Sequence, residues 1–325
     1  MTDEDRLEFL GQVAAWYYED NMDQAEIAKR IGKSRSMVSR LLTEARDAGL
    51  VQIRVRFPLR TDTELADELR AAYGLAEAHV LVGSASADNE SMLRRLGRLG
   101  ARALQSKLRS GVTVTVGWGA ALHSVVRAMP EIQLEDVMVL QAMGSVGDGD
   151  PNVDGADVAR TLAGKLNGDF RAMSAPLIVD RAEAAHSLLS DRTIATTLRM
   201  AETSAVAITG IGSIDSSLSG LLRAGYFDED TTARLRDMGV VGDVMGFLID
   251  EQGRVLAIPE NDRVVALHPD RLAGIETVIG VAGGPGKAGA ITAVLRGRML
   301  DMIVTDAATA RAALAMHGSD DLIGV

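Results

Sequence analysis

The chain has 325 residues, with 34 lysines and arginines against 45 aspartates and glutamates, a net charge of −11 at pH 7, and no cysteine. The lack of cysteine excludes disulfides, cysteine-ligated zinc and thiol catalysis, and it fits a reducing compartment. The acidic opening MTDEDRLEFL is unlike a signal peptide, and no stretch reaches the roughly 20 apolar residues that span a bilayer. We therefore expect a cytoplasmic protein, and the length predicts two domains.

Positive charge is concentrated in one early segment. Nine basic and only two acidic residues lie between Lys29 and Arg60, so this segment carries +7 while the rest of the chain carries −18. A basic segment on an acidic protein is typical of a module that binds a polyanion such as nucleic acid. The alternative is an ordinary solvated helix face.

Three helices are predicted near the beginning of the chain from apolar residues at three- and four-residue spacing. They cover 4–20, 24–31 and 35–48. Asp23 and Ser34 are suited to cap the second and third helices, and Gly32 is suited to end the second in a left-handed conformation. Two short helices joined by such a turn form a helix-turn-helix, whose second helix can enter the major groove of DNA.

The third predicted helix has a polar, basic face. Its inward positions are Met37, Val38, Leu41, Leu42 and Ala45. Outside, Arg40 could pair bidentately with guanine, Arg35 and Ser36 occupy the turn that usually meets base edges, and Lys33 is suited to phosphate. The predicted DNA-binding residues are Lys33, Ser34, Arg35, Ser36, Ser39, Arg40 and Arg46. A plain three-helix bundle with surface arginines is the alternative.

A domain boundary is predicted shortly after this helix. Val51–Phe57 alternates apolar and polar residues, which predicts a strand or a β-wing that ends at Pro58. The predicted domains are 1–57, for DNA binding, and 58–325, for effector binding and oligomerisation. A helical pattern resumes over Thr63–Tyr73, so we expect a helical linker.

The remainder alternates strand-like and helical segments, which predicts an α/β domain with a mostly parallel, doubly wound sheet. The predicted strands cover 78–82, 112–116, 137–140, 206–209, 278–282 and 302–304. The predicted helices cover 89–108, 120–129, 158–167, 287–296 and 307–316.

Three of the predicted strands end in glycine-rich turns. These turns are Gly117–Ala121, Gly210–Ser213 and Gly283–Lys287. Because ligands bind at the carboxyl edge of open α/β sheets, we expect the turns to meet in one pocket for a phosphate or a hydroxylated ligand.

These turns do not match the nucleotide-binding motifs. Val281 stands where a Walker A loop needs its first glycine, and Ala288 stands where it needs serine or threonine. Leu122 stands where a dinucleotide fingerprint needs its third glycine. No nucleotide cofactor is predicted.

Segments spread over nearly the whole chain form a recognisable set. The first is QAEIAKRIGKSRSMVSRLLTEARDAGLVQIRV, and the later ones are VTVGWGAALHSVV, AITGIGSID, VGDVMGFLIDEQGRVL, NDRVVAL, VAGGPGKAGAITAVLRG and IVTDAATARAAL. Together they resemble the SorC family of bacterial transcriptional regulators, which are similar to the deoxyribonucleoside regulator. The resemblance implies a winged helix-turn-helix joined to a domain that resembles sugar-phosphate isomerases. It also implies a homotetramer whose hold on its operator is controlled by a sugar, often phosphorylated.

The resemblance also implies an effector site. Its residues, together with the second glycine turn, would be Gly117, Trp118, Gly119, Ala120, Ala121, Gln141, Gly210, Asp243 and Lys287. Asp243 and Gln141 suit sugar hydroxyls, and Lys287 suits an anionic group. The alternatives are a turn or cap for Asp243, a strand-end role for Gln141 and a solvated Lys287.

The glycine loop departs from the family pattern at two positions. Ala120 and Ala121 stand where the family usually has a threonine whose hydroxyl helps to hold the effector's phosphate. A charge-assisted hydrogen bond contributes about 1.5–3 kcal/mol. Its loss weakens the case for a phosphorylated effector and strengthens that for a free sugar or polyol.

The sequence therefore predicts a DNA-binding regulator of carbohydrate-metabolism genes that is controlled by a sugar, polyol or sugar phosphate. The alternative is an isomerase-like enzyme fused to a helix-turn-helix, which needs a base and an acid beside the substrate. None of the five histidines is expected at a strand end near a carboxylate, and Asp150, Asp154 and Asp157 lack a metal-ligand spacing. We expect no catalytic residue, metal or cofactor, and at least a dimer on operator DNA.

Overall fold

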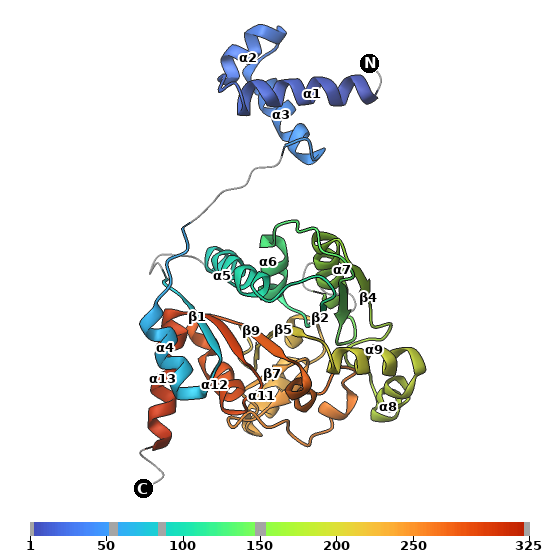
Figure 1. The fold of residues 1–325 in the computed structure, drawn as a ribbon, viewed down its shortest axis with the longest axis vertical. Coiled ribbons are helices and arrows are strands. Elements are labelled where there is room, and N and C mark those ends of the chain that lie inside the picture. Colours follow the sequence, from blue (N-terminus) through green and yellow to red (C-terminus); the bar gives the residue numbers. More distant parts are fainter. Residues whose placement is uncertain (1–2, 52–57, 84–88, 147–153, 322–325) are drawn as a thin grey trace. The chain divides into compact units, whose positions relative to one another are not determined.

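The computed structural model describes residues 3–51, 58–83, 89–146 and 154–321. The chain divides into two compact units, Met1–Pro58 and Leu59–Val325. Figure 1 shows the elements of each unit along the chain.

The small unit consists of α1 (Asp3–Tyr18), α2 (Gln24–Ile31) and α3 (Arg35–Asp47). They enclose a core of Leu10, Val13, Ala14, Ile27, Ala28, Val38, Leu41, Leu42 and Ala45. Met37, which was predicted to face inward, is exposed instead, at 39%.

The predicted caps are confirmed. Asp23 forms a capping box with Glu26 at the start of α2. Gly32 ends α2 with φ +65°, and Ser34 Oγ accepts the Met37 N–H at the start of α3. Local side-chain chemistry therefore fixes the turn between α2 and α3. Of the predicted strand, residues 52–57 lie outside the described residues.

The large unit contains a seven-stranded sheet in the order β1-β10-β9-β5-β2-β3-β4, with every neighbouring pair parallel. Its strands are β1 (Glu77–Leu81), β2 (Thr113–Val116), β3 (Met138–Gln141), β4 (Asp169–Arg171), β5 (Val206–Gly210), β9 (Thr277–Val281) and β10 (Met302–Asp306). The predicted parallel sheet is confirmed. Strand β4 was not predicted, because it is short and largely exposed and lacks the apolar run that marks the other strands.

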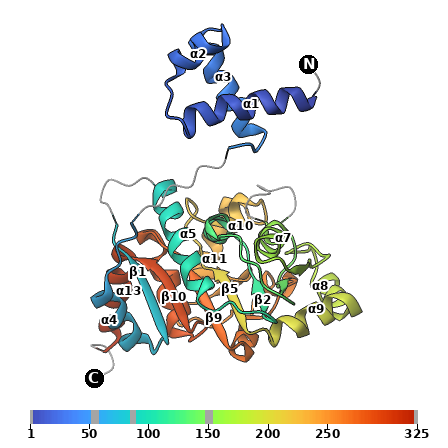
Figure 2. The same ribbon diagram turned by 45° about the horizontal axis from the view of Figure 1, so that its top comes forward.

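Helices cover both faces of this sheet, as Figures 1 and 2 show. They are α4 (Thr63–Tyr73), α5 (Asn89–Gln105), α6 (Ala120–Ala128), α7 (Gly155–Leu166), α8 (Ala182–Ser190), α9 (Arg192–Glu202), α10 (Gly220–Arg223), α11 (Glu229–Asp237), α12 (Ala288–Arg296) and α13 (Ala307–Asp321). One core joins α5, α6 and α7 to the sheet, and another joins α4, α11, α12 and α13 to it. This is the doubly wound arrangement that the sequence predicted.

Helix α4 is part of the large unit, which corrects its predicted role as a linker. Its residues Leu65, Leu69 and Tyr73 are buried in the large core. The Tyr73 hydroxyl also donates to the carbonyl of Ala313 in α13, at 2.7 Å.

A small antiparallel sheet was not predicted. It consists of β6 (Gly212–Ser213), β7 (Gly242–Val244) and β8 (Phe247–Ile249), in that order. Met245 and Gly246 connect β7 to β8 with φ values of +54° and +84°. Positive φ at both turn residues is typical of a type I′ hairpin, which usually carries asparagine or glycine rather than methionine.

None of the described helices is long and apolar enough to cross a membrane.

Candidate functional site

A cavity of about 1330 Å³ opens at the carboxyl edge of the large sheet. The strand order reverses at β2, since β3 and β4 extend the sheet on one side of β2 while β5 and β9 extend it on the other. The cavity lies at this reversal, because the turns after β2 and β5 line it. In open α/β sheets, ligands bind at such reversals.

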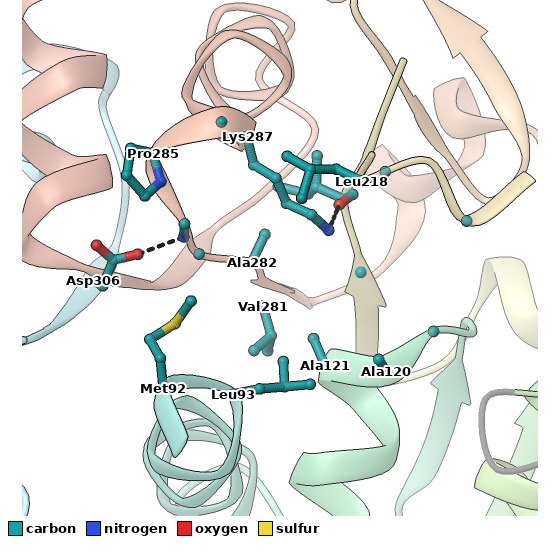
Figure 3. Close-up of a pocket in the computed structure, with 18 of the residues that line it drawn as sticks. Met92, Leu93, Ala120, Ala121, Leu218, Val281, Ala282, Pro285, Lys287 and Asp306 are labelled. Atoms are coloured by element: carbon teal, nitrogen blue, oxygen red, sulfur yellow. Dashed lines mark hydrogen bonds between the residues drawn. The ribbon is translucent and has the colours of Figure 1, made fainter. Parts of the chain in front are cut away.

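The structure brings the three glycine-rich turns together around this cavity. The turn after β2 contributes Trp118–Ala121, the turn after β5 contributes Gly210–Gly212, and the turn after β9 contributes Gly283–Lys287. Figure 3 shows Ala120 and Ala121 across the cavity from Lys287. Met92 and Leu93 of α5 add an apolar part of the wall.

A buried carboxylate and a half-buried ammonium lie in the cavity wall. Asp243, on β7, is 5% exposed, and burial raises its pKa to about 6 against the opposing effects of Lys287 and of a hydrogen bond from the Gly246 backbone. Burial also lowers the pKa of the Lys287 ammonium. Lys287 Nζ donates to the carbonyl oxygen of Ile211 at 2.9 Å (Figure 3). Because each charge has lost water, an incoming polar ligand can gain strong interactions with both.

Gly212 allows Asp243 to lie against the second glycine turn. A Cβ atom on Gly212 would lie 1.8 Å from Asp243 Oδ1, which is far inside van der Waals contact. This glycine is therefore required by the close approach of a carboxylate.

The structure gives Gln141 a structural role in place of the predicted effector contact. Gln141 is fully buried and does not line the cavity. Its Oε1 accepts the Met173 N–H at 2.9 Å, and its Nε2 donates to Ser145 Oγ at 3.2 Å. Gly117 also lies outside the cavity wall, and its N–H donates to the Ile208 carbonyl at 2.9 Å.

Asp306 is a cavity residue that the sequence analysis missed. Its Oδ2 accepts the Gly284 N–H at 2.7 Å (Figure 3). Oδ2 also accepts the Thr309 hydroxyl at 2.6 Å, and Oδ1 accepts the Ala308 N–H at 3.0 Å. It therefore holds the third glycine turn against the first turn of α13. An aspartate between an apolar strand and a predicted helix was an N-cap signal that could have revealed it.

The predicted DNA-binding residues all lie exposed on or next to α3. Among the described residues, Lys33, Arg35 and Arg40 form no salt bridge. The Ser34 hydroxyl, by contrast, is already engaged in capping α3. The three cations are thus free to meet phosphates or base edges.

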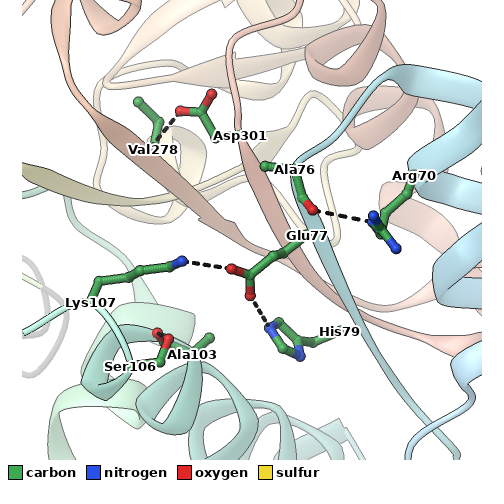
Figure 4. A network of polar contacts seen from close by, with 9 residues as sticks. All are labelled: Arg70, Ala76, Glu77, His79, Ala103, Ser106, Lys107, Val278 and Asp301. Carbon is green, nitrogen blue, oxygen red and sulfur yellow. Dashed lines mark hydrogen bonds and ion pairs between the residues drawn. The ribbon is translucent and has the colours of Figure 1, made fainter.

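Two histidines have carboxylate neighbours, but neither lies at the end of a strand and both lie away from the cavity. His79 Nε2 is 3.3 Å from Glu77, which also accepts Lys107 Nζ at 2.6 Å (Figure 4). The Lys107 hydrogen bond is the main cause that holds the pKa of Glu77 below its usual value. Because Glu77 begins β1, this network lies at the amino edge of the sheet. His268 is 3.4 Å from Asp270 and also lies outside the cavity wall.

No histidine lines the cavity among the residues that the structure describes. In the same part of the chain, no group of three or more His, Asp or Glu side chains is placed to hold a metal ion.

Comparisons with known proteins agree with this architecture. Residues 58–315 match the Sugar-bind family model, whose description is "Putative sugar-binding domain". The deoxyribonucleoside regulator of Bacillus subtilis (strain 168) is 31% identical over 311 residues, which cover 95% of this chain and 98% of that protein. The transcriptional regulator LsrR of Klebsiella pneumoniae subsp. pneumoniae is 31% identical over 312 residues, with coverages of 95% and 93%.

A solved structure shows the same fold over nearly the whole chain. The full-length sorbitol operon regulator SorC from Klebsiella pneumoniae superposes with a TM-score of 0.70 at 25% identity, covering 95% of this chain and 99% of that one. Fold, cavity and relatives thus define a transcriptional regulator with an α/β domain of the sugar-binding type. The chain belongs to the SorC family.

Proposed function

We propose that this protein regulates carbohydrate-metabolism genes by binding operator DNA through α3, and that a sugar, polyol or sugar phosphate in the large cavity controls this binding. The observation that carries the proposal is a buried carboxylate, Asp243, and a half-buried ammonium, Lys287, beside three glycine-rich turns at the sheet reversal.

The cavity wall suits a hydroxylated ligand with at most a few negative charges. Among the described residues, the wall carries three arginines and one lysine against three aspartates. The Asp243 carboxylate would accept hydrogen bonds from ligand hydroxyls, and the two Lys287 protons not donated to Ile211 would bind an anionic or hydroxyl oxygen. Trp118 offers an apolar surface for the C–H groups of a sugar.

DNA binding would require more than one copy of the chain. A single helix-turn-helix buries little DNA surface, so specific affinity comes from at least a dimer on half-sites spaced by whole helical turns. We propose that the assembly is a homotetramer. It would act in the cytoplasm, where its operator is found.

An isomerase-like activity has one feature in its favour. Asp243, with a pKa of about 6 in the cavity, has the properties of a general base. We propose a binding role for it, because the curated relatives named above are transcriptional regulators. Turnover of D-ribose 5-phosphate or D-glucose 6-phosphate by the purified chain would contradict this assignment.

The direct test is thermal unfolding of the full chain with a defined panel of compounds. The panel contains D-ribose, sorbitol, D-ribose 5-phosphate, D-glucose 6-phosphate and inorganic phosphate. A compound present at about 100 times its Kd stabilises the folded protein by about 2.7 kcal/mol, which raises the melting temperature measurably. Stabilisation by one or more sugars supports the proposal, and no shift with any sugar in the panel would refute the carbohydrate-binding role.

Effector affinity should depend on pH through Asp243. Since its pKa is about 6, this carboxylate is mostly ionised at pH 7 and mostly protonated at pH 5. A protonated Asp243 accepts fewer hydroxyl donors, so affinity should fall by about tenfold from pH 7 to pH 5. Isothermal titration calorimetry at both pH values measures the change.

Asp243→Asn is the control for this pH dependence. The variant should bind the effector more weakly at pH 7, and its affinity should depend less on pH. Titration of a ligand phosphate would change the affinity of both proteins in the same way. Equal pH profiles for the two proteins would show that Asp243 does not contact the effector.

A further inference from the structure

The first residues of the large unit form part of the cavity wall. Arg60 and Asp62 pair through their backbones with Val82 and Val80, at 2.8 and 2.9 Å. Between these bonds, residue 61 forms an antiparallel bridge with residue 81 at the end of β1. The segment 59–62 therefore adds a short piece of strand to the sheet. It also follows directly on Pro58, the last residue of the small unit.

The side chain of Asp62 joins three parts of the large unit. It lines the cavity, its Oδ1 accepts the Leu65 N–H at the start of α4 at 3.1 Å, and its Oδ2 lies 3.7 Å from Arg311 Nη2 on α13. Arg311 lines the same cavity. An ion pair between the connecting segment and α13 thus lies in the wall of the proposed effector site.

A second cavity residue bonds to the strand end that pairs with this segment. Arg95 of α5 lines the cavity and donates from Nη2 to the Val82 carbonyl at 2.8 Å. The Val82 N–H in turn donates to the Arg60 carbonyl. The backbone that follows the small unit is therefore tied to two arginines that an effector would meet.

We propose that Asp62 and Arg311 are effector-sensing residues and that they transmit occupancy of the cavity to residues 59–62. An oxygen-rich ligand group would compete with Asp62 for the Arg311 guanidinium, and this would loosen the hold of α13 on the segment. The Arg311 side chain is 64% exposed and the pair is long, so little stability is lost when the partner is exchanged. This inference rests on the proposed function, because it needs a ligand in the cavity and DNA on α3.

The ligand can change DNA binding only if it interacts differently with two states of the segment 59–62, one in which Asp62 pairs with Arg311 and one in which it does not. The ligand would bind the Arg311 guanidinium only in the second state, and this is the required difference. This exchange of partners also predicts that Asp62 affects the response of DNA binding to the ligand more than it affects ligand binding itself.

The test uses the full chain, the panel sugar that raises the wild-type melting temperature most, and the promoter region that precedes its own gene. Asp62→Asn removes the ion pair but keeps a good N-cap for α4. Asp67→Asn is the matched control, since Asp67 pairs with Arg70 at 3.0 Å on the same helix and does not line the cavity. Fluorescence anisotropy measures the DNA Kd with and without the sugar.

We expect the sugar to change the DNA Kd of the wild type and of Asp67→Asn by about tenfold, and that of Asp62→Asn by less than about threefold. Calorimetry should show that Asp62→Asn still binds the sugar at least as tightly as the wild type, because Arg311 is then unpaired. If Asp62→Asn fails to fold, Arg311→Gln takes its place, with the same loss of DNA response expected. A wild-type DNA response in the folded variant would overturn the inference. A wild type that binds no panel sugar would instead refute the proposed function and this inference with it.

Discussion

Arg40→Ala should weaken binding to the operator by about 10- to 100-fold and relax the preference at one base position. The side chain is exposed on α3 and, among the described residues, has no acidic partner, so it is free to form a bidentate pair with a guanine. Such pairs discriminate against the wrong base by about 1–3 kcal/mol. Anisotropy titrations against the promoter fragment and against single-base variants of it measure both effects.

Two other substitutions show whether Arg40 reads bases. Lys33→Ala should weaken binding to promoter and random DNA alike and reduce the salt slope by about 1, as expected for a phosphate contact. Arg199→Ala, on α9 of the large unit, removes an arginine that bonds to Thr196 and should leave DNA affinity unchanged. If Arg40→Ala lost the same factor on random DNA, the base-reading role would be wrong.

Lys287→Met should reduce affinity for the stabilising panel sugar by about 10- to 100-fold. The Lys287 side chain is half-buried in the cavity wall, where desolvation lowers the pKa of its ammonium, and a charge-assisted hydrogen bond contributes about 1.5–3 kcal/mol. Methionine keeps the length of the side chain but removes its three donors. Calorimetric titration of the variant against the wild type measures the loss.

Lys107→Met is the matched control for Lys287→Met. Lys107 also lies beside a carboxylate, Glu77, but at the amino edge of the sheet, away from the cavity (Figure 4). This variant should bind the sugar like the wild type. If Lys287→Met bound it equally well while remaining folded, Lys287 would not be a ligand residue.

The small unit could be predicted almost residue by residue because its signals are local. Asp23, Gly32 and Ser34 fix the ends of α2 and α3 through bonds to residues two to four positions away. Such bonds depend little on the rest of the fold. The exposure of Met37 was not predicted, because the spacing of apolar residues along a helix does not show which of them other helices cover.

The large sheet could be predicted where its strands are apolar and β-branched. The short strands β4 and β6–β8 have no such run, and the Met245-Gly246 turn lacks the residues that usually mark a hairpin. Helices α8 to α11 were also left unassigned by the sequence analysis. For α11, a strongly polar sequence explains why no apolar stripe was visible.

The cavity could be predicted in part. The carboxyl ends of parallel strands share one edge, so the three glycine-rich turns had to lie near each other. The direction of the Gln141 side chain depends on the distant residues Ser145 and Met173, which sequence spacing does not reveal. The meeting of Asp62 with Arg311 likewise depends on how α4 packs against α13.

In the proposed function, one chain binds operator DNA through α3 and binds a carbohydrate in its large cavity. The most direct measurement is the affinity of the full chain for its own promoter region and for a scrambled duplex, at about 0.1 M salt, with and without each panel sugar. We expect a clear preference for the promoter and a change of about tenfold in that affinity with at least one sugar. Equal affinity for both duplexes, unchanged by every sugar, would contradict it.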